Sequence, residues 1–89
     1  MAQQAEAIQT MTVKIFSPSV DYFDGEATML SAVNKTGAFD VLPLHHNFIT
    51  LLDQGNIRVI DDKNKEKIVE ITVGLLHVKN NVVTVFLDV

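Results

Sequence analysis

The sequence predicts an all-β protein, a small flattened β-sandwich or barrel of roughly eight to ten short strands. Three observations predict this fold class. Short apolar runs recur along the chain and are separated by turn residues such as Pro, Gly, Asn and Asp. Residues 67–73 alternate, with Val69, Ile71 and Val73 on one face, which is the period of a half-buried strand. Helical periodicity is not convincing anywhere in the chain.

The turn residues divide the apolar runs into individual strands. Pro18 and Pro43 each end a strand, because proline cannot donate a hydrogen bond to a ladder. Asp24-Gly25 is interpreted as a tight turn, and Gly74 predicts a bulge or a bend. The predicted strands in chain order are residues 12–16, 20–23, 26–33, 39–42, 48–52, 56–60, 67–73, 75–78 and 82–87.

The chain divides into two parts of different composition. Residues 1–10 are polar and rich in Ala and Gln, and they predict a leader that is either disordered or a short helix. Residues 11–89 predict one sandwich domain, since 89 residues is the length of a single domain. A chain of this size has a modest hydrophobic core, so its stability on its own is expected to be marginal.

Composition and charge exclude several classes of protein. The net charge is −4 and the seven Lys and Arg residues are scattered, so we expect no nucleic-acid partner and no binding to anionic membrane surfaces. Cysteine is absent, which removes disulfide and thiolate chemistry. Neither a signal peptide nor a run of about 18 apolar residues is found. We therefore expect a soluble, cytoplasmic protein without direct membrane insertion. We also expect it to be a monomer when isolated.

Few residues suggest chemistry. Asp40, His45 and His46 are the one group that could bind zinc, which takes imidazole and carboxylate ligands. Adjacent histidines in a strand point to opposite faces, however, and would need a turn to converge. The simpler interpretation has His45 packed or hydrogen-bonded beside Pro43 and His46 exposed. His77 alternates with apolar neighbours and is expected at the surface of a strand.

Acidic pairs and aromatic residues are better explained by structure than by function. Pairs of Asp residues can act in acid–base catalysis, but these occur in predicted turns, where Asp hydrogen-bonds its own backbone. The pairs are Asp21 with Asp24 and Asp61 with Asp62. The phenylalanines Phe23, Phe39, Phe48 and Phe86 are predicted to form the core. No phosphate-binding glycine loop is present, and we expect no catalytic residue, no cofactor and no resident metal.

Five ordered blocks resemble one family, the epsilon subunits of F-type ATP synthase. The most specific block is GAFDVLPLH at residues 37–45, which is similar to the family pattern G-x-[LF]-[GA]-[IV]-[LY]-P-x-H. The other blocks are TVKIFSP at residues 12–18, FDGEA at 23–27, TLLDQGNIRV at 50–59 and the closing hairpin at 74–85. The resemblance extends from about Met11 to Val89 and implies the N-terminal β-sandwich of that subunit.

The chain departs from the family pattern in four places. Family members usually continue into a pair of C-terminal helices that inhibit ATP hydrolysis, whereas this sequence stops at Val89. The resemblance therefore implies a chain that couples rotation without that inhibition. Three further substitutions are Val73-Gly74 for Gly-Gly, His46-Asn47 for Ala-Pro, and Ala38 for an acidic residue.

The resemblance implies that the protein is a non-catalytic rotor subunit of the central stalk. Family members link the gamma subunit to the ring of c subunits and thereby couple ion translocation to ATP synthesis. Position by position, the resemblance places Ser17, His45 and Thr50 against gamma. It places Asn34, Lys35, Thr36 and Gly37 against the c-ring, at the cytoplasmic face of a bacterial inner membrane. The alternative that the residues leave open is a free-standing sandwich that binds a small ligand or a metal.

Overall fold

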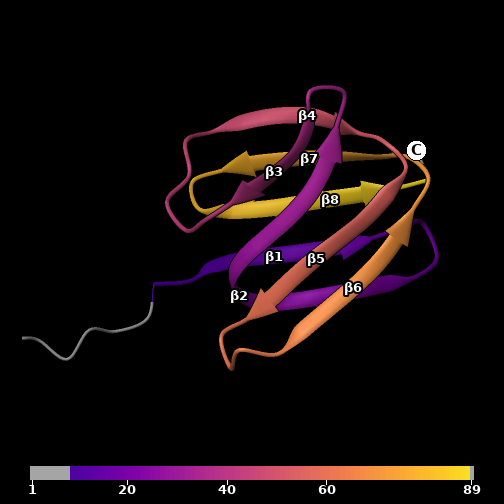
Figure 1. Cartoon of the computed structure of the whole chain (residues 1–89). Helices are drawn as coiled ribbons and strands as arrows, with labels where there is room; N and C mark the ends of the chain where they lie inside the picture. The colour runs from indigo at the N-terminus through magenta and orange to yellow at the C-terminus, as the bar shows by residue number, and fades with distance from the viewer. Residues whose placement is uncertain (1–8, 89) are drawn as a thin grey trace, which may run out of the picture.

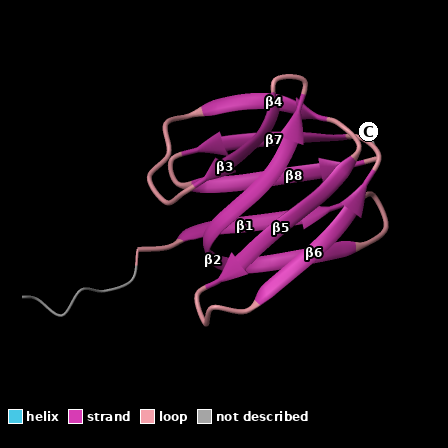
Figure 2. Ribbon diagram, viewed as in Figure 1, coloured by secondary structure: helices cyan, strands magenta, loops and turns pink. Residues whose placement is uncertain are grey.

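One long strand, β2 (Asp21–Asn34), runs through both layers of the fold. Its first half pairs with β1 and its second half pairs with β3 and β5. The computed structural model describes residues 9–88, and every regular element in that range is a strand (Figure 2). The other strands are β1 (Met11–Phe16), β3 (Gly37–Val41), β4 (Phe48–Leu52), β5 (Gly55–Asp61), β6 (Glu66–Ile71), β7 (Gly74–Lys79) and β8 (Val82–Leu87).

A single mixed sheet folds over on itself to make the two layers. Its strand order is β4-β7-β8-β1-β2-β5-β6, with β3 paired to β2 off this path. Only β1 and β8 run parallel, and every other pair is antiparallel. In Figure 1, β1, β7 and β8 lie across the view, while β5, β6 and the second half of β2 run diagonally in front of this layer. Near the end of β2, the Asp53 amide donates to the Val33 carbonyl at 2.9 Å, which ties β4 to the second layer.

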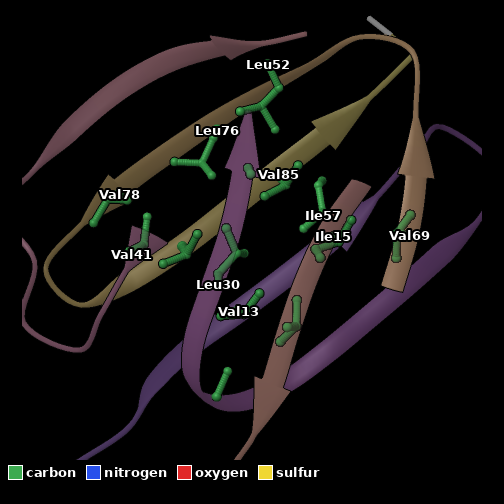
Figure 3. Packing of buried hydrophobic residues seen from close by; sticks show 14 of the residues in the cluster. Val13, Ile15, Leu30, Val41, Leu52, Ile57, Val69, Leu76, Val78 and Val85 are labelled. Atoms are coloured by element: carbon green, nitrogen blue, oxygen red, sulfur yellow. The ribbon is translucent and has the colours of Figure 1, made fainter. Parts of the chain in front are cut away.

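Alternating residues from both layers fill the space between them. Met11, Val13 and Ile15 of β1 point inward and are buried, whereas Thr12 and Lys14 point outward. Figure 3 shows Leu30 of β2 pointing toward side chains from the opposite layer. The core is almost entirely aliphatic; its fully buried side chains are Met11, Val13, Ile15, Leu30, Val41, Leu52, Ile57, Val59, Leu76, Val78, Val83 and Val85.

The predicted all-β sandwich is confirmed, and eight strands fall within the predicted number. The bounds predicted for β4 and β8 agree with the structure residue for residue. Gly74 opens β7 directly after a bend, as predicted. The segment predicted as a leader lies outside the described residues except for residues 9 and 10. No helix in the described range is long and apolar enough to cross a membrane.

Two details of the predicted strands are wrong. Asp24-Gly25 is not a turn, because Asp24 pairs with Lys14 and Gly25 with Val13 in the middle of the β1–β2 ladder. The strand predicted over residues 67–73 ends at Ile71, so Val73 lies in the bend and is exposed. The backbone there has another partner, since the Val73 carbonyl accepts the Asp88 amide at 3.3 Å.

The predicted phenylalanine core is also wrong. Phe23, Phe39 and Phe48 are only partly buried and pack against the aliphatic core from its margins. Phe86 points away from the core, because the inward positions of β8 are Val83, Val85 and Leu87. Its ring stacks instead on Phe16 of the neighbouring strand, with ring centroids 5.0 Å apart.

Candidate functional site

A polar hairpin turn, residues 34–37, joins β2 to β3 at one end of the molecule. The Asn34 side-chain oxygen accepts the Thr36 amide at 2.9 Å and the Thr36 hydroxyl at 2.7 Å. Gly37 has φ 117°, a backbone conformation that favours glycine. These bonds leave Lys35 and Thr36 exposed at the tip of the turn.

Thr50 lies directly beside this turn. The side-chain amide of Asn34 donates to the Thr50 hydroxyl at 3.1 Å. Thr50, predicted to contact gamma, therefore touches the turn that is predicted to contact the c-ring. Ile49 and Leu51 flank Thr50 on β4 and are both 61% exposed. Together the turn and β4 line a shallow hollow formed by Asn34, Lys35, Thr36, Ile49, Thr50 and Leu51.

His45 lies in the loop of residues 42–47, which packs against the β7–β8 turn. The His45 ring stacks on His46 and tilts against Phe48, with centroid distances of 4.3 and 4.9 Å. Two side-chain oxygens hold this loop, because Asn81 accepts the Leu44 amide at 2.8 Å and Asn47 accepts the Asn80 amide at 2.9 Å. His45 is half-buried and His46 exposed, as the simpler interpretation predicted.

The structure does not gather the zinc candidates into a site. Asp40 lies on β3 and accepts the Ser31 hydroxyl at 2.6 Å, while the two histidines stack on each other. Within residues 9–88, no three His, Asp or Glu side chains lie close enough together to hold a metal ion. His77 is exposed on β7, as expected.

The two acidic pairs have different structural roles. Asp61 behaves as predicted for a turn residue, because its carboxylate accepts the Lys63 and Lys65 amides, both at 2.8 Å. The bond from the Lys65 amide is the main cause that lowers the pKa of Asp61. Asp21 and Asp24 instead lie within β2, where they face Phe16 and Lys14 across the ladder. Neither arrangement gives two carboxylates a shared cleft.

Ser17 is the predicted gamma contact with the clearest structural role. It follows β1 and is 7% exposed, the one buried polar residue of the described range. Its hydroxyl accepts the Val20 amide at 3.2 Å, and its own amide donates to the Val20 carbonyl at 2.7 Å. Ser17 therefore closes the turn that leads from β1 into β2 and offers little surface to a partner.

We expect Ser17→Ala to lower the free energy of unfolding by about 1 kcal/mol, because the Val20 amide loses its acceptor. Urea denaturation of the two purified proteins measures this difference. Ser19→Ala, in the same turn but exposed, is the control and should change little. Equal stability of Ser17→Ala and the wild type would contradict the structural role.

The three predicted gamma contacts do not form one compact cluster. Ser17 lies beyond the end of β1, beside the end of β8, because the Phe16 and Phe86 positions pair. His45 lies at the start of β8, where the Asn81 side chain holds its loop. The length of β8 separates them, roughly 15–20 Å for a strand of this size. Thr50 is on the edge strand between these two ends.

An apolar row between these three residues was missed by the sequence analysis. Leu51, Leu75, Phe86 and Phe16 pair in that order across β4, β7, β8 and β1. All four point away from the core, on what we call the outer face. The missed signal was the alternation in β1, β7 and β8: once the inward positions are known, the apolar residues between them must face outward.

Glu26 anchors the beginning of the described chain. Its carboxylate accepts the Thr12 hydroxyl at 2.7 Å and the Thr10 hydroxyl at 2.8 Å. These two bonds, the Thr12 bond first, favour the charged form and hold the pKa of Glu26 below its ordinary value of 4.5. The unfolded chain therefore binds this proton at a higher pH than the folded chain does.

This pKa shift predicts a pH dependence of stability. The contribution of Glu26 to the free energy of unfolding is fully present well above pH 4.5. It is lost as pH falls through that value toward the lower pKa of Glu26 in the folded chain. We expect Glu26→Gln to show a shallower loss of melting temperature than the wild type between about pH 5 and pH 3. Identical slopes for the two proteins would contradict this role. The melting temperature of the variant should still fall somewhat as pH falls, because the pKa of Asp61 is also lowered in the folded chain.

Comparison with known proteins assigns the sequence to a family. Residues 10–89 match the family described as ATP synthase, Delta/Epsilon chain, beta-sandwich domain. The chain belongs to this family. It is 38% identical over 79 residues to an ATP synthase epsilon chain of Acinetobacter baumannii and 34% identical to that of Psychrobacter cryohalolentis. The aligned part is 89% of this chain and 57% of either relative, so the chain spans little more than half their length.

Solved structures share the fold at lower sequence identity. A chain in the Euglena gracilis mitochondrial ATP synthase, solved with OSCP, F1 and c-ring, superposes with a TM-score of 0.82 at 17% identity, covering 97% of this chain and 56% of that one. A chain in the central stalk and c-ring structure of the Tetrahymena thermophila enzyme gives a TM-score of 0.73 at 20% identity, covering 89% and 63%. Both confirm the β-sandwich.

Proposed function

We propose that this epsilon-family chain is a non-catalytic subunit of the ATP synthase central stalk that links the gamma subunit to the c-ring. In this role it transmits rotation and couples ion translocation to ATP synthesis, as a peripheral part of a complex at the cytoplasmic face of a bacterial membrane. The observation that carries the proposal is the family match over residues 10–89, supported by 38% identity to a bacterial epsilon chain.

A rigid sandwich suits a part that must resist torque. Both layers belong to one hydrogen-bonded sheet, and β2 continues from one layer into the other. Load applied at the polar turn of residues 34–37 can therefore pass along β2 to β1 through backbone hydrogen bonds. Local opening of the sandwich would break apolar contacts in its buried core, which costs free energy.

The c-ring contact is proposed at the tip of that turn. Lys35 and Thr36 are exposed there, and Ala38 supplies no carboxylate beside them. We expect a charge reversal, Lys35→Glu, to weaken binding to a purified c-ring and to leave gamma affinity unchanged. Lys63→Glu, in the β5–β6 turn, is the matched control and should affect neither. A ring affinity that Lys35→Glu leaves intact would contradict the proposed contact.

The gamma contact is tested by binding of the purified chain to its cognate gamma subunit. Isothermal titration calorimetry should report a one-to-one complex, and the free chain should sediment as a monomer. Charge insertion at Thr50 is a poor probe, because this half-buried hydroxyl is bonded to Asn34 and its loss would also disturb the turn. A folded chain that binds no gamma would contradict the proposed function.

A further inference from the structure

We propose that Asn81 is the positioning residue for the loop of residues 42–47. Its side chain holds Leu44 in a left-handed backbone conformation and thereby fixes the place of His45. The functional part of this role rests on the proposed function, because His45 is there a contact with the gamma subunit. The structural part concerns the conformation of the loop in the free chain and is testable without any partner.

Residues 42–45 form a tight β-turn at the start of this loop. The His45 amide donates to the Leu42 carbonyl at 3.1 Å, and Leu44, at the third position of the turn, has φ 67°. With Pro43 at the second position, this is the arrangement of a type II turn, whose third residue needs positive φ and is normally Gly or Asn. Leucine is strained there, because its Cβ lies too close to the following carbonyl oxygen.

Burial of the Leu44 side chain does not offset this strain. The side chain is 67% exposed, and that of Leu42 in the same turn is 53% exposed. Within residues 9–88, every other non-glycine residue with positive φ is Asn or Asp, the types that tolerate this conformation. A strained residue persists only where the surrounding structure fixes it, and such residues are concentrated at functional sites. A contact from outside the turn must therefore hold Leu44.

Asn81, in the β7–β8 turn, supplies this contact. Its side-chain oxygen accepts the Leu44 amide at 2.8 Å, and its side-chain nitrogen donates to the Thr10 carbonyl at 2.9 Å. Its own carbonyl accepts the Thr12 amide at 3.2 Å. One half-buried residue therefore joins the loop to the chain that enters β1, although these partners lie 37 and 71 positions away in the sequence.

The neighbouring Asn80 offers a matched control. It also has positive φ, 51° against 66° for Asn81, and it lies in the same two-residue turn. Its backbone amide donates to the Asn47 side-chain oxygen at 2.9 Å, a bond that remains when the Asn80 side chain is removed. That side chain is exposed. Replacing either residue by glycine therefore makes the same change in the turn, but only Asn81→Gly removes the acceptor of the Leu44 amide.

The bond from Leu44 to Asn81 matters for binding because it keeps the loop in one conformation. The dihedral angles of Leu44 set the direction in which the chain enters His45. Without its acceptor, Leu44 is free to leave the strained conformation, and His45 moves with it. A loop that is already ordered loses less conformational freedom when a partner binds, so loss of the bond should lower gamma affinity even though His45 itself is unchanged.

The first test measures amide hydrogen exchange by NMR in the free, full chain, after circular dichroism has established that each variant folds. We expect Asn81→Gly to speed exchange of the Leu44 and His45 amides by about tenfold or more relative to Asn80→Gly. Asn81→Asp keeps the acceptor for Leu44 and loses only the donor to Thr10, so exchange of the Leu44 and His45 amides should stay within about threefold of the wild type.

Leu44→Gly tests the strain independently of Asn81. Glycine suits the third position of a type II turn, so this variant should melt a few degrees above the wild type. In the Asn81→Gly background, Leu44→Gly should slow the exchange of the His45 amide again, because the turn then forms without help from Asn81. A melting temperature that Leu44→Gly leaves unchanged or lowers would contradict the strain at Leu44.

Calorimetry with purified gamma tests the functional part. Asn81→Gly should weaken gamma binding by roughly tenfold, while Asn81→Asp and Asn80→Gly stay within about threefold of the wild type. Adding Leu44→Gly to Asn81→Gly should recover most of the lost affinity. A role of Asn81 in fold stability alone would not produce this recovery, because the second substitution restores the turn and not the bonds of Asn81.

The two tests separate failure of the inference from failure of the proposed function. If the Leu44 amide exchanges equally fast in Asn81→Gly and Asn80→Gly, Asn81 does not hold the loop and the inference is overturned. If Asn81→Gly frees the loop but binds gamma as tightly as the wild type, the positioning role is overturned and the proposed function survives. If the folded wild type binds no gamma, the proposed function fails, whereas hydrogen exchange still decides whether Asn81 holds Leu44.

Discussion

Leu30→Ala is expected to lower the free energy of unfolding by about 3 kcal/mol. Leu30 is fully buried at the point where β2 passes between the layers, paired with Val41 on one side and Val59 on the other. Its truncation removes apolar contacts and leaves a cavity that two paired strands cannot collapse to fill. The total stability of a small domain is roughly 5–15 kcal/mol, so this single change removes a large share.

The melting temperature of Leu30→Ala should fall by on the order of 15 °C for a domain of this size. Leu51→Ala is the control, because it makes the same chemical change at a side chain that is 61% exposed, and its cost should stay within about 0.5 kcal/mol. Equal losses for the two variants would contradict the assignment of Leu30 to the inner face and Leu51 to the outer face.

Gly74→Ala is expected to cost about 2 kcal/mol through overpacking. A Cβ at Gly74 would lie 2.9 Å from the Leu87 Cδ2 and 3.3 Å from the Phe86 carbonyl oxygen. Leu87 is buried and the carbonyl is part of the β7–β8 ladder, so neither neighbour can move freely. Thermal denaturation followed by circular dichroism measures the cost directly.

Gly25→Ala is the control for Gly74→Ala. It tests whether crowding by neighbouring atoms, and not the mere addition of a side chain at a glycine, causes the loss of stability. Gly25 lies in the β1–β2 ladder, and a Cβ there would meet nothing closer than the Phe23 ring at 3.8 Å. Its replacement should be neutral or stabilise the protein by up to about 1 kcal/mol, because alanine restricts the unfolded chain. If Gly25→Ala proved as destabilising as Gly74→Ala, crowding by Leu87 would not explain the requirement for glycine.

The strands that end at strong turn signals were predictable from sequence. β4 lies between the Pro43 loop and Asp53, and β8 begins after Asn80-Asn81, whose backbones both have positive φ. The turn predicted at Asp24-Gly25 was wrong because turn propensity is a local property, whereas the pairing of these residues with Lys14 and Val13 depends on a distant strand. No local pattern reveals that one long strand will serve both layers.

The sequence predicts which segments belong to the candidate site, but not which of their residues share one surface. The turn at residues 34–37 lies between the strands predicted over residues 26–33 and 39–42, and Asn34 and Thr36 close it. Which residues share a face depends on strand order, and the parallel pairing of β1 with β8 is what brings Phe16 beside Phe86. Aromatic residues were assigned to the core by hydrophobicity alone, so Phe86 was placed on the wrong side of its strand.

ATP-driven ion transport tests the central claim most directly, in membrane vesicles whose ATP synthase has been depleted of its epsilon subunit. The claim is that this chain couples the rotation of the c-ring to gamma. Adding the purified chain is expected to restore transport, and Lys35→Glu at the same concentration should restore less. A folded wild-type chain that binds the depleted enzyme but restores no transport would contradict the coupling role.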